Sequence, residues 1–433
     1  MTATTSSYLE RLLQGTPQPP ASAPGWLGRL RAEAVDRVGT LTVPTTRDEE
    51  WRFTDIAPLT SRSFQPVQTA SGLGPADAAR LYLDEAATRL VLVDGVHAPA
   101  LSSGRGDGGA LLASLAQALS ARTPGIESHL GAHAGFGDNV FTALNTAFLH
   151  DGALIIVPRN VSVAAPVHLL FIATKKDAVS HPRCLVVAEP GSDVTIVEDF
   201  VALTGEAYFT NAVTEIAVAD NARVTHVRVQ RESGQAFHIA RCAVSLGHAS
   251  RYRSVAVALG ASISRLDLDV LQAGEGGECS IDGLALIGKG QLADTHTRID
   301  HARPHGVSRQ LHKCIVGGAV HAVFNGKIMV RAGAQRTDSA QSSRNLLLTG
   351  RAHVDTKPQL EIFADDVKCA HGATVGQLES EEVFYLRSRG LSESAARNLL
   401  TYAFGAEIID RIPVASLKAR LEQTMLEHAA EKP

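Results

Sequence analysis

A cysteine and a histidine two residues apart form the most specific candidate for metal chemistry in this sequence. Cys369 and His371 lie in the run DDVKCAHG, at the end of a long region of β-branched residues. Residues i and i+2 of an extended strand point to the same face, so the pair could offer one sulfur and one nitrogen to one metal ion. A closed tetrahedral site needs about two more ligands. We therefore expect a partner chain or a transient geometry to supply the missing ligands, or else Cys369 to be a buried thiol beside a structural histidine.

Five histidines in a short stretch form a second candidate metal site. They are separated by 5, 4, 7 and 9 residues: His296, His301, His305, His312 and His321. These spacings match no common pattern of metal ligands, and a single histidine in a strand is more often held by hydrogen bonds than by a metal. The sequence leaves the role of these histidines open.

The run GLALIGKG at 283–290 has the spacing of a phosphate-binding loop but lacks the Ser or Thr that should follow its lysine. That hydroxyl is needed on Mg²⁺, and the apolar interior of the run indicates a strand. We therefore expect any ATP that this protein uses to be held by another chain.

Composition and cysteine spacing exclude several classes of protein. The chain has 433 residues and a net charge of −4, which argues against binding to nucleic acid. Five widely spaced cysteines without a CxxC pair exclude a zinc ribbon or ferredoxin-type site and favour a reducing compartment. No apolar run reaches the roughly 20 residues of a spanning helix, and the N-terminus shows no export signal. We expect a cytoplasmic protein that binds neither nucleic acid nor membrane.

Short strands are the elements that must position these residues. From about 153 to 363 the chain is a succession of β-branched runs, such as VHLLFIA and DVTIVEDF, without crossover helices, which excludes a doubly wound α/β fold. Val194, Val224, Tyr252 and Cys279 each follow a small-residue turn, at intervals of 30, 28 and 27 residues. This drifting period and the few aromatic residues are typical of a β-solenoid with two or more strands per coil. A large antiparallel sandwich is the alternative fold.

Helical regions are expected on both sides of the strands. We divide the chain into a mixed, largely helical N-terminal region at 1–150, a β-helix core at 151–375 and a C-terminal helical domain at 376–433. Within the N-terminal region, the patterns predict helices at 26–38, 109–121 and 138–150 and a strand at 89–96.

Three helices are predicted near the C-terminus. Ser380 can cap the first, Ser392 can cap the second, and the third covers 415–431. The second helix gathers apolar residues on one side, among them Leu399, Leu400, Phe404 and Ile408. This face could close the end of the solenoid, dock another protein, or do both.

Residues 324–400, from FNGKIMVRAGAQ to SAARNLL, resemble the shared C-terminal half of the SufB and SufD proteins of iron–sulfur cluster assembly. Weaker agreement covers 294–318 and the run EEWRFTDI at 49–56. The form KCAHGATVG around His371 and the run FYLRSRG at 384–390 are most similar to SufD. SufB-like chains carry a glutamate-histidine-glutamate element where this chain has Ala-His-Gly, so those glutamates would belong to a partner chain.

The resemblance implies a right-handed parallel β-helix between helical ends, and a non-catalytic scaffold subunit that works with a SufB-like paralogue and the ABC ATPase SufC. His371 would face the paralogue and help to build or hold a nascent iron–sulfur cluster, assisted by Cys369. SufC would hold ATP and dock on the C-terminal helices, through a surface that includes Phe384, Leu399, Leu400, Phe404 and Ile408. The chain alone would hold no stable cofactor, and the resemblance leaves open a flavin in the complex and a homodimer of the isolated chain.

Two other functions stay open at this stage. One is a SufB-like scaffold that holds a cluster without its paralogue. The other is a carbohydrate-active β-helix enzyme, which fits poorly because such enzymes stack sugars on aromatic rings and this chain has only 13 Phe, 6 Tyr and 2 Trp. The sequence does not decide the subunit ratio, or whether iron, sulfur or electrons pass through this subunit.

Overall fold

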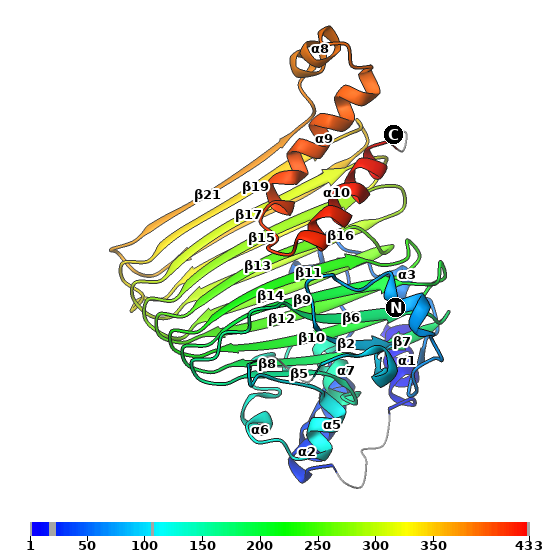
Figure 1. The fold of residues 1–433 in the computed structure, drawn as a ribbon, viewed down its shortest axis with the longest axis vertical. Helices are drawn as coiled ribbons and strands as arrows, with labels where there is room; N and C mark the ends of the chain where they lie inside the picture. Colours follow the sequence, from blue (N-terminus) through cyan, green and yellow to red (C-terminus); the bar gives the residue numbers. More distant parts are fainter. Residues whose placement is uncertain (1, 17–22, 105–107, 431–433) are drawn as a thin grey trace.

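Two stacked parallel sheets form the centre of the computed structural model, which describes residues 2–16, 23–104 and 108–430 (Figure 1). Most even-numbered strands form sheet A, in the order β20-β18-β16-β14-β12-β10-β8-β5-β4. The second sheet, sheet B, has the order β21-β19-β17-β15-β13-β11-β9-β6-β2-β3. From β8 to β21 consecutive strands alternate between the sheets, so each coil in this part of the chain adds one strand to each sheet. The fold is a β-solenoid of about 8 turns.

The strand bounds are as follows. Sheet A contains β4 (Leu111–Ser114), β5 (Gly152–Val157), β8 (Arg183–Ala188), β10 (Phe209–Val218), β12 (Phe237–Leu246), β14 (Ile263–Gln272), β16 (Leu292–His301), β18 (His321–Val330) and β20 (His353–Ile362), with β7 (Ala178–Ser180) paired to β10 and β1 (Gln65–Pro66) paired to β7. Sheet B contains β3 (Val96–His97), β2 (Thr88–Val93), β6 (Val167–Ala173), β9 (Asp193–Ala202), β11 (Arg223–Arg231), β13 (Arg251–Ala258), β15 (Glu278–Ile287), β17 (Val307–Val316), β19 (Asp338–Leu347) and β21 (Lys368–Gly376).

Strand pairing confirms the predicted solenoid and excludes the sandwich. Neighbouring strands of the coils are parallel, and the antiparallel pairs are β2–β3 and β4–β5 near the N-terminal end. The predicted period is also confirmed, because the four residues used to find it are successive register partners in sheet B: Val194, Val224, Tyr252 and Cys279. The same column continues through Ser308 and Ser339 to Cys369.

The interior between the sheets is filled mainly by small and branched side chains. The largest buried cluster takes residues from both sheets, among them Val186, Ile196, Val224, Val244 and Ile281. Period-2 alternation places every second residue of a strand in this space. Backbone pairing between neighbouring strands sets the spacing of the coils, and these small side chains fill the narrow space between the two sheets.

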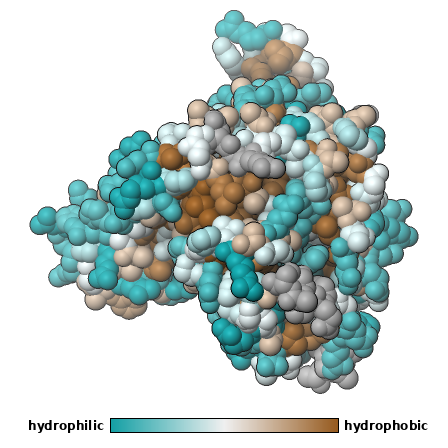
Figure 2. All heavy atoms as spheres, turned by 60° about the horizontal axis from the view of Figure 1, so that its bottom comes forward, coloured by the Kyte–Doolittle hydropathy of each residue, from teal (hydrophilic) through white to brown (hydrophobic). Residues whose placement is uncertain are grey.

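Helices cover the N-terminal end and part of sheet A (Figure 1). The segments are α1 (Thr2–Leu13), α2 (Gly25–Thr40), η1 (Glu49–Trp51), α3 (Ala57–Thr60), α4 (Pro75–Ala79), η2 (Pro99–Leu101), α5 (Leu115–Ser120), α6 (Ile126–His129) and α7 (Val140–Ala147). Buried residues of α2 recur at helical spacing, at Leu27, Ala34 and Val38, and α2 packs against α7. Figure 2 shows hydrophobic residues gathered near the centre of this end, with hydrophilic residues around them.

Most predicted N-terminal elements are confirmed, and one is wrong in part. Helices α2 and α7 and strand β2 match the predictions at 26–38, 138–150 and 89–96. The predicted helix at 109–121 begins instead as strand β4, because these residues pair with β5; Ser114 then caps the short helix α5 by accepting a hydrogen bond from the Gln117 amide at 3.3 Å. Since β2 and β4 precede residue 150, the two sheets extend into the predicted N-terminal region.

Three helices follow the last strand, namely α8 (Ser380–Ser388), α9 (Glu393–Ile409) and α10 (Ala415–Ala430). Glu379, and not Ser380, occupies the N-cap position of α8, whereas the predicted cap of α9 is confirmed, because Ser392 accepts a hydrogen bond from the Ala395 amide at 3.1 Å. Helices α9 and α10 lie across sheet B, and α8 projects beyond β21 (Figure 1). Their buried face packs on the outward residues of the sheet, including Val227, Val255 and Leu284.

Helix α10 also reaches back to the segment that precedes the first strand of sheet B. Arg420 donates hydrogen bonds to the carbonyl oxygens of Leu81, at 3.0 Å, and Tyr82. Nearby, the Ser416 amide donates to Glu85 Oε1 at 2.8 Å. The C-terminal helices therefore connect the last coils to the first. Among the described residues, no helix is long and apolar enough to cross a bilayer.

Candidate functional site

The C-terminal end of the solenoid presents two open strand edges. β20 is the last strand of sheet A and β21 the last of sheet B, and within the described part of the chain nothing pairs with their outer edges. Most residues of β21 are exposed. An exposed edge is a row of backbone donors and acceptors that can pair with a strand of another chain.

Cys369 and His371 lie on β21 and face the interior of the solenoid at this open end. Cys369 is the register partner of Ser339, and His371 is the register partner of Gln341. Both partners are buried, and Gln341 Nε2 donates to Gln310 Oε1 of the preceding coil at 2.8 Å. Cys369 is partly buried against the interior cluster, whereas His371 is exposed. The imidazole therefore ends an interior column of polar side chains at a surface that another chain can reach.

The thiol and the imidazole form an incomplete set of metal ligands. Neither residue belongs to a group of three or more His, Cys, Asp or Glu side chains with converging ligand atoms, among the residues that the structure describes. Partial burial, followed by the nearby Asp338 carboxylate, raises the pKa of the Cys369 thiol. Since the thiolate is the form that binds metal, a cation at this site must displace a firmly held proton.

The five histidines between 296 and 321 do not share a site, because the strands carry them to different faces. Buried His301 contacts Ser308 Oγ at 3.0 Å. His312 is buried and stacks on Phe324 with ring centroids 4.3 Å apart. His305 lies in an exposed turn. Burial lowers the pKa of His301 to about 4 and that of His312 to about 3, so both imidazoles are neutral at pH 7.

His296 lies on the outer face of sheet A and holds the N-terminal segment there. Its Nε2 is 3.0 Å from Asp294 Oδ1, and its Nδ1 is 3.2 Å from Glu50 Oε2. Thr54 Oγ1 also donates to Asp294, at 2.7 Å. Although burial alone would lower it, the two carboxylates raise the pKa of His296 to about 9. This histidine therefore has a structural ion-pair role that its spacing in the sequence did not indicate.

The run with phosphate-loop spacing is part of a strand and a turn. Gly283 lies within β15, in register with His312. A Cβ at this position would lie 2.4 Å from the imidazole, so the glycine makes room for a ring. The prediction of a strand at this run is confirmed.

The predicted partner-binding residues divide into an exposed and a covered group. Phe384 on α8 is 71% exposed and Leu399 on α9 is 43% exposed, whereas Leu400 is partly buried. Ile408 is fully buried against sheet B, and the Phe404 ring lies 4.4 Å from the Lys313 ammonium. Ile408 therefore fixes α9 to the solenoid and does not contribute to an exposed surface.

A buried polar network in the early coils was missed by sequence reasoning. Glu198 is paired with Arg228 and accepts a hydrogen bond from Thr214 Oγ1 at 2.6 Å. Although burial alone would raise it, Arg228 and then His226 hold the pKa of Glu198 at about 2. Glu198 and Arg228 are 30 residues apart, which is the length of one coil. This interval is the sequence feature from which their pairing could have been predicted.

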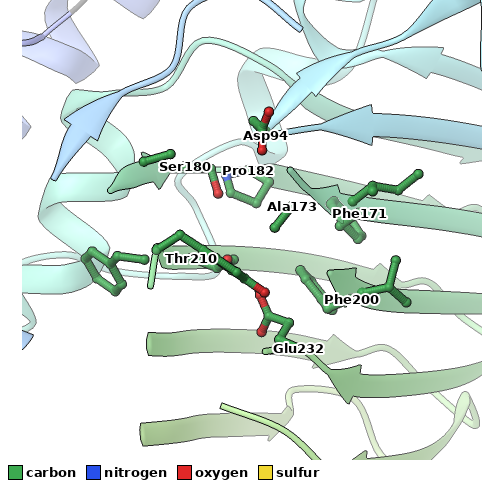
Figure 3. A pocket seen from close by; sticks show the side chains of 14 residues that line it. Asp94, Phe171, Ala173, Ser180, Pro182, Phe200, Thr210 and Glu232 are labelled. Atoms are coloured by element: carbon green, nitrogen blue, oxygen red, sulfur yellow. The ribbon is translucent and has the colours of Figure 1, made fainter. Parts of the chain in front are cut away.

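Figure 3 shows a small cavity near this network, lined in part by Phe200, whose ring packs under the Arg228 guanidinium. Thr210 Oγ1 donates to Glu232 at 2.9 Å, and Phe171 and Phe200 stack with centroids 4.3 Å apart. The volume of about 20 Å³ suits a water molecule.

Comparison with known proteins identifies the family. Residues 171–404 match the model described as the SufBD core domain of SUF system FeS cluster assembly, and residues 20–169 match the SufBD protein N-terminal region. The chain belongs to the SufBD family. The two matches leave only short ends of the chain outside the family models.

Relatives in this family include proteins named SufD. An iron–sulfur cluster assembly SufBD family protein of Synechocystis is 43% identical over 405 residues, which cover 91% of this chain and 89% of the relative. The iron–sulfur cluster assembly protein SufD of Escherichia coli is 34% identical, with 88% of each chain covered. SufD of Bacillus subtilis is 27% identical, with 92% of this chain and 93% of the relative covered. The predicted membership of the SufB/SufD family is thus confirmed, and this protein is a SufD homologue of the SUF system.

Proposed function

We propose that this SufBD family protein is a SufD-like scaffold subunit that acts with a SufB-like paralogue and a SufC-like ATPase to build and hand on iron–sulfur clusters. The observation that carries the proposal is the open end of the solenoid, where exposed His371 and half-buried Cys369 adjoin an unpaired strand edge. The similarity to proteins named SufD supports a SufD-like role for this chain over a SufB-like one.

In this proposal the open edges of β20 and β21 pair with strands of the paralogue. Such pairing satisfies the free backbone groups and brings the partner's side chains next to His371. The His371 imidazole supplies one nitrogen to the nascent cluster, which is the cargo of the complex. Cys369 supplies a thiolate once the incoming cation displaces its proton.

The proposal makes this chain a non-catalytic subunit. ATP binds and is hydrolysed on the SufC-like partner, which docks on the C-terminal helices near Phe384 and Leu399. Because α9 packs directly on β15 and β17, a movement of the docked ATPase is passed to the solenoid. The complex works in the cytoplasm, the cluster is held transiently, and no residue of this chain is assigned to a flavin.

The test uses the complete complex. The chain is co-expressed with the paralogue and the ATPase, and cluster formation is followed anaerobically by visible absorbance and bound iron. We expect His371→Ala to co-purify with both partners in unchanged amounts but to form few clusters, whereas His305→Ala, an exposed histidine in a turn, behaves as wild type. Undiminished cluster formation by His371→Ala would remove the assigned role. A stable cluster reconstituted on the lone chain would indicate a self-sufficient scaffold instead.

A further inference from the structure

Two histidines and an aspartate meet on the outer face of sheet A, where sequence spacing did not place a site. His321 begins β18 and His353 begins β20, and they are direct register partners. Asp355 follows two residues along β20. Ala322 follows His321 on β18, and its register partner Val354 lies between His353 and Asp355 on β20. Both pack in a second interior cluster with Cys314 and Val316 of sheet B. Alternation along the strands therefore directs the two imidazoles and the carboxylate outward.

The three side chains converge on one another. His321 Nε2 lies 2.5 Å from Asp355 Oδ2, and His353 Nε2 lies 3.7 Å from Asp355 Oδ1, so each carboxylate oxygen faces one imidazole. All three ligand atoms lie within 4.8 Å of one another. Among the described residues, 2–16, 23–104 and 108–430, this is the one group of three or more His, Cys, Asp or Glu side chains whose ligand atoms lie so close together. Binding of an ion would replace the hydrogen bond between His321 and Asp355 with two bonds to the metal and would draw in the exposed His353 ring.

The surroundings hold two of the three ligands in place and leave the third free. The Phe53 ring meets His321 edge-on with centroids 6.3 Å apart. The side chains of His321 and Asp355 are 28% and 27% exposed, against 69% for His353. Lys357, the next outward residue on β20, is paired with Glu49, so its charge is balanced by a carboxylate other than Asp355.

We propose that His321, His353 and Asp355 bind a divalent transition metal ion. Two imidazole nitrogens and one carboxylate oxygen suit Zn²⁺ and Fe²⁺, whereas Mg²⁺ and Ca²⁺ prefer all-oxygen sites. Three protein ligands leave at least one coordination position open for water. This site is separate from Cys369 and His371, which face the interior from the other sheet.

The binding test uses the full chain after treatment with a chelator. Isothermal titration with Zn²⁺, and with Fe²⁺ under anaerobic conditions, should show one ion bound at this site, and Mg²⁺ should not compete. His353→Ala and Asp355→Asn should each weaken that binding about tenfold or more, since each removes a ligand. Both changes are at partly or fully exposed positions, so the fold should persist, which circular dichroism checks. Co²⁺ offers a second readout, because its visible absorption at the site should be lost in both variants.

A matched variant distinguishes this site from other exposed histidines. His305→Ala removes an exposed histidine elsewhere on the solenoid, in neither proposed site. It should keep the Zn²⁺ titration and the Co²⁺ spectrum of the wild type. Failure of the wild type to bind either ion, or equal binding by the wild type, His353→Ala and Asp355→Asn, would overturn the proposal.

Discussion

Gln341 and His371 are register partners on the last two strands of sheet B, and only Gln341 is buried. This contrast separates a structural position from a functional one. His371→Ala should change the free energy of unfolding by less than about 0.5 kcal/mol. Gln341→Ala should cost about 1–2 kcal/mol, because Gln310 then loses its buried donor. Urea unfolding followed by circular dichroism measures both, and a larger loss for His371→Ala would contradict its exposed placement.

The buried ion pair of Glu198 and Arg228 predicts that removing one partner alone strongly lowers the free energy of unfolding. Arg228→Met leaves the Glu198 carboxylate buried without its main counter-charge, which should cost about 3–5 kcal/mol. Adding Glu198→Gln to this variant removes the uncompensated charge, so the double variant should recover a large part of the loss. Chemical denaturation of the wild type, both single variants and the double variant gives the coupling energy. Additive losses would show that the pair is not coupled.

The ion pair that holds the N-terminal segment predicts a loss of stability in alkali. The pKa of His296 is raised from 6.5 to about 9 in the folded chain, so the native state favours the charged imidazole. Its contribution is complete below pH 6.5 and is lost as the pH rises through about 9. We expect a decrease on the order of 3 kcal/mol between pH 6.5 and 10.

Urea midpoints across this pH range measure the effect, and His296→Gln is the control because its side chain does not titrate. The variant should be less stable than the wild type at pH 6.5 and should show a shallower decline. Equal slopes for both proteins would mean that another group is responsible.

Substitutions in the C-terminal helices should separate two effects, a loss of stability and a loss of ATPase binding. Ile408→Asp places a charge in the buried contact of α9 with sheet B and should cost about 3 kcal/mol or more. Phe384→Asp changes an exposed side chain, so stability should stay within about 0.5 kcal/mol of the wild type. If α8 docks the ATPase, the second variant alone should weaken its binding without altering the melting temperature. Unchanged ATPase binding by Phe384→Asp would place the docking surface elsewhere.

Most of the fold follows from one sequence pattern. Val194, Val224, Tyr252 and Cys279 mark a period that the register pairs reproduce, because each coil must return its chain to the same sheet. The pattern correctly predicts the strands that pair with another strand on each side. It fails at 109–121, where residues of good helix propensity extend into β4 because pairing with β5 outweighs local preference.

The candidate sites were harder to predict, since neighbours in space are about one coil apart in sequence. His321 was grouped with His312, whereas its actual neighbours are His353 and Asp355. Applying the coil period to each polar residue would have found this group. Ile408 illustrates a different limit, because an apolar helix face has the same pattern whether it covers its own solenoid or a partner.

The contact of α10 with Leu81 and Tyr82 gives the molecule a brace that runs along its length. A load on α9 is shared by the coils that α9 and α10 pack against and by the segment ahead of β2. We therefore expect the coils beneath these helices to resist separation one strand at a time.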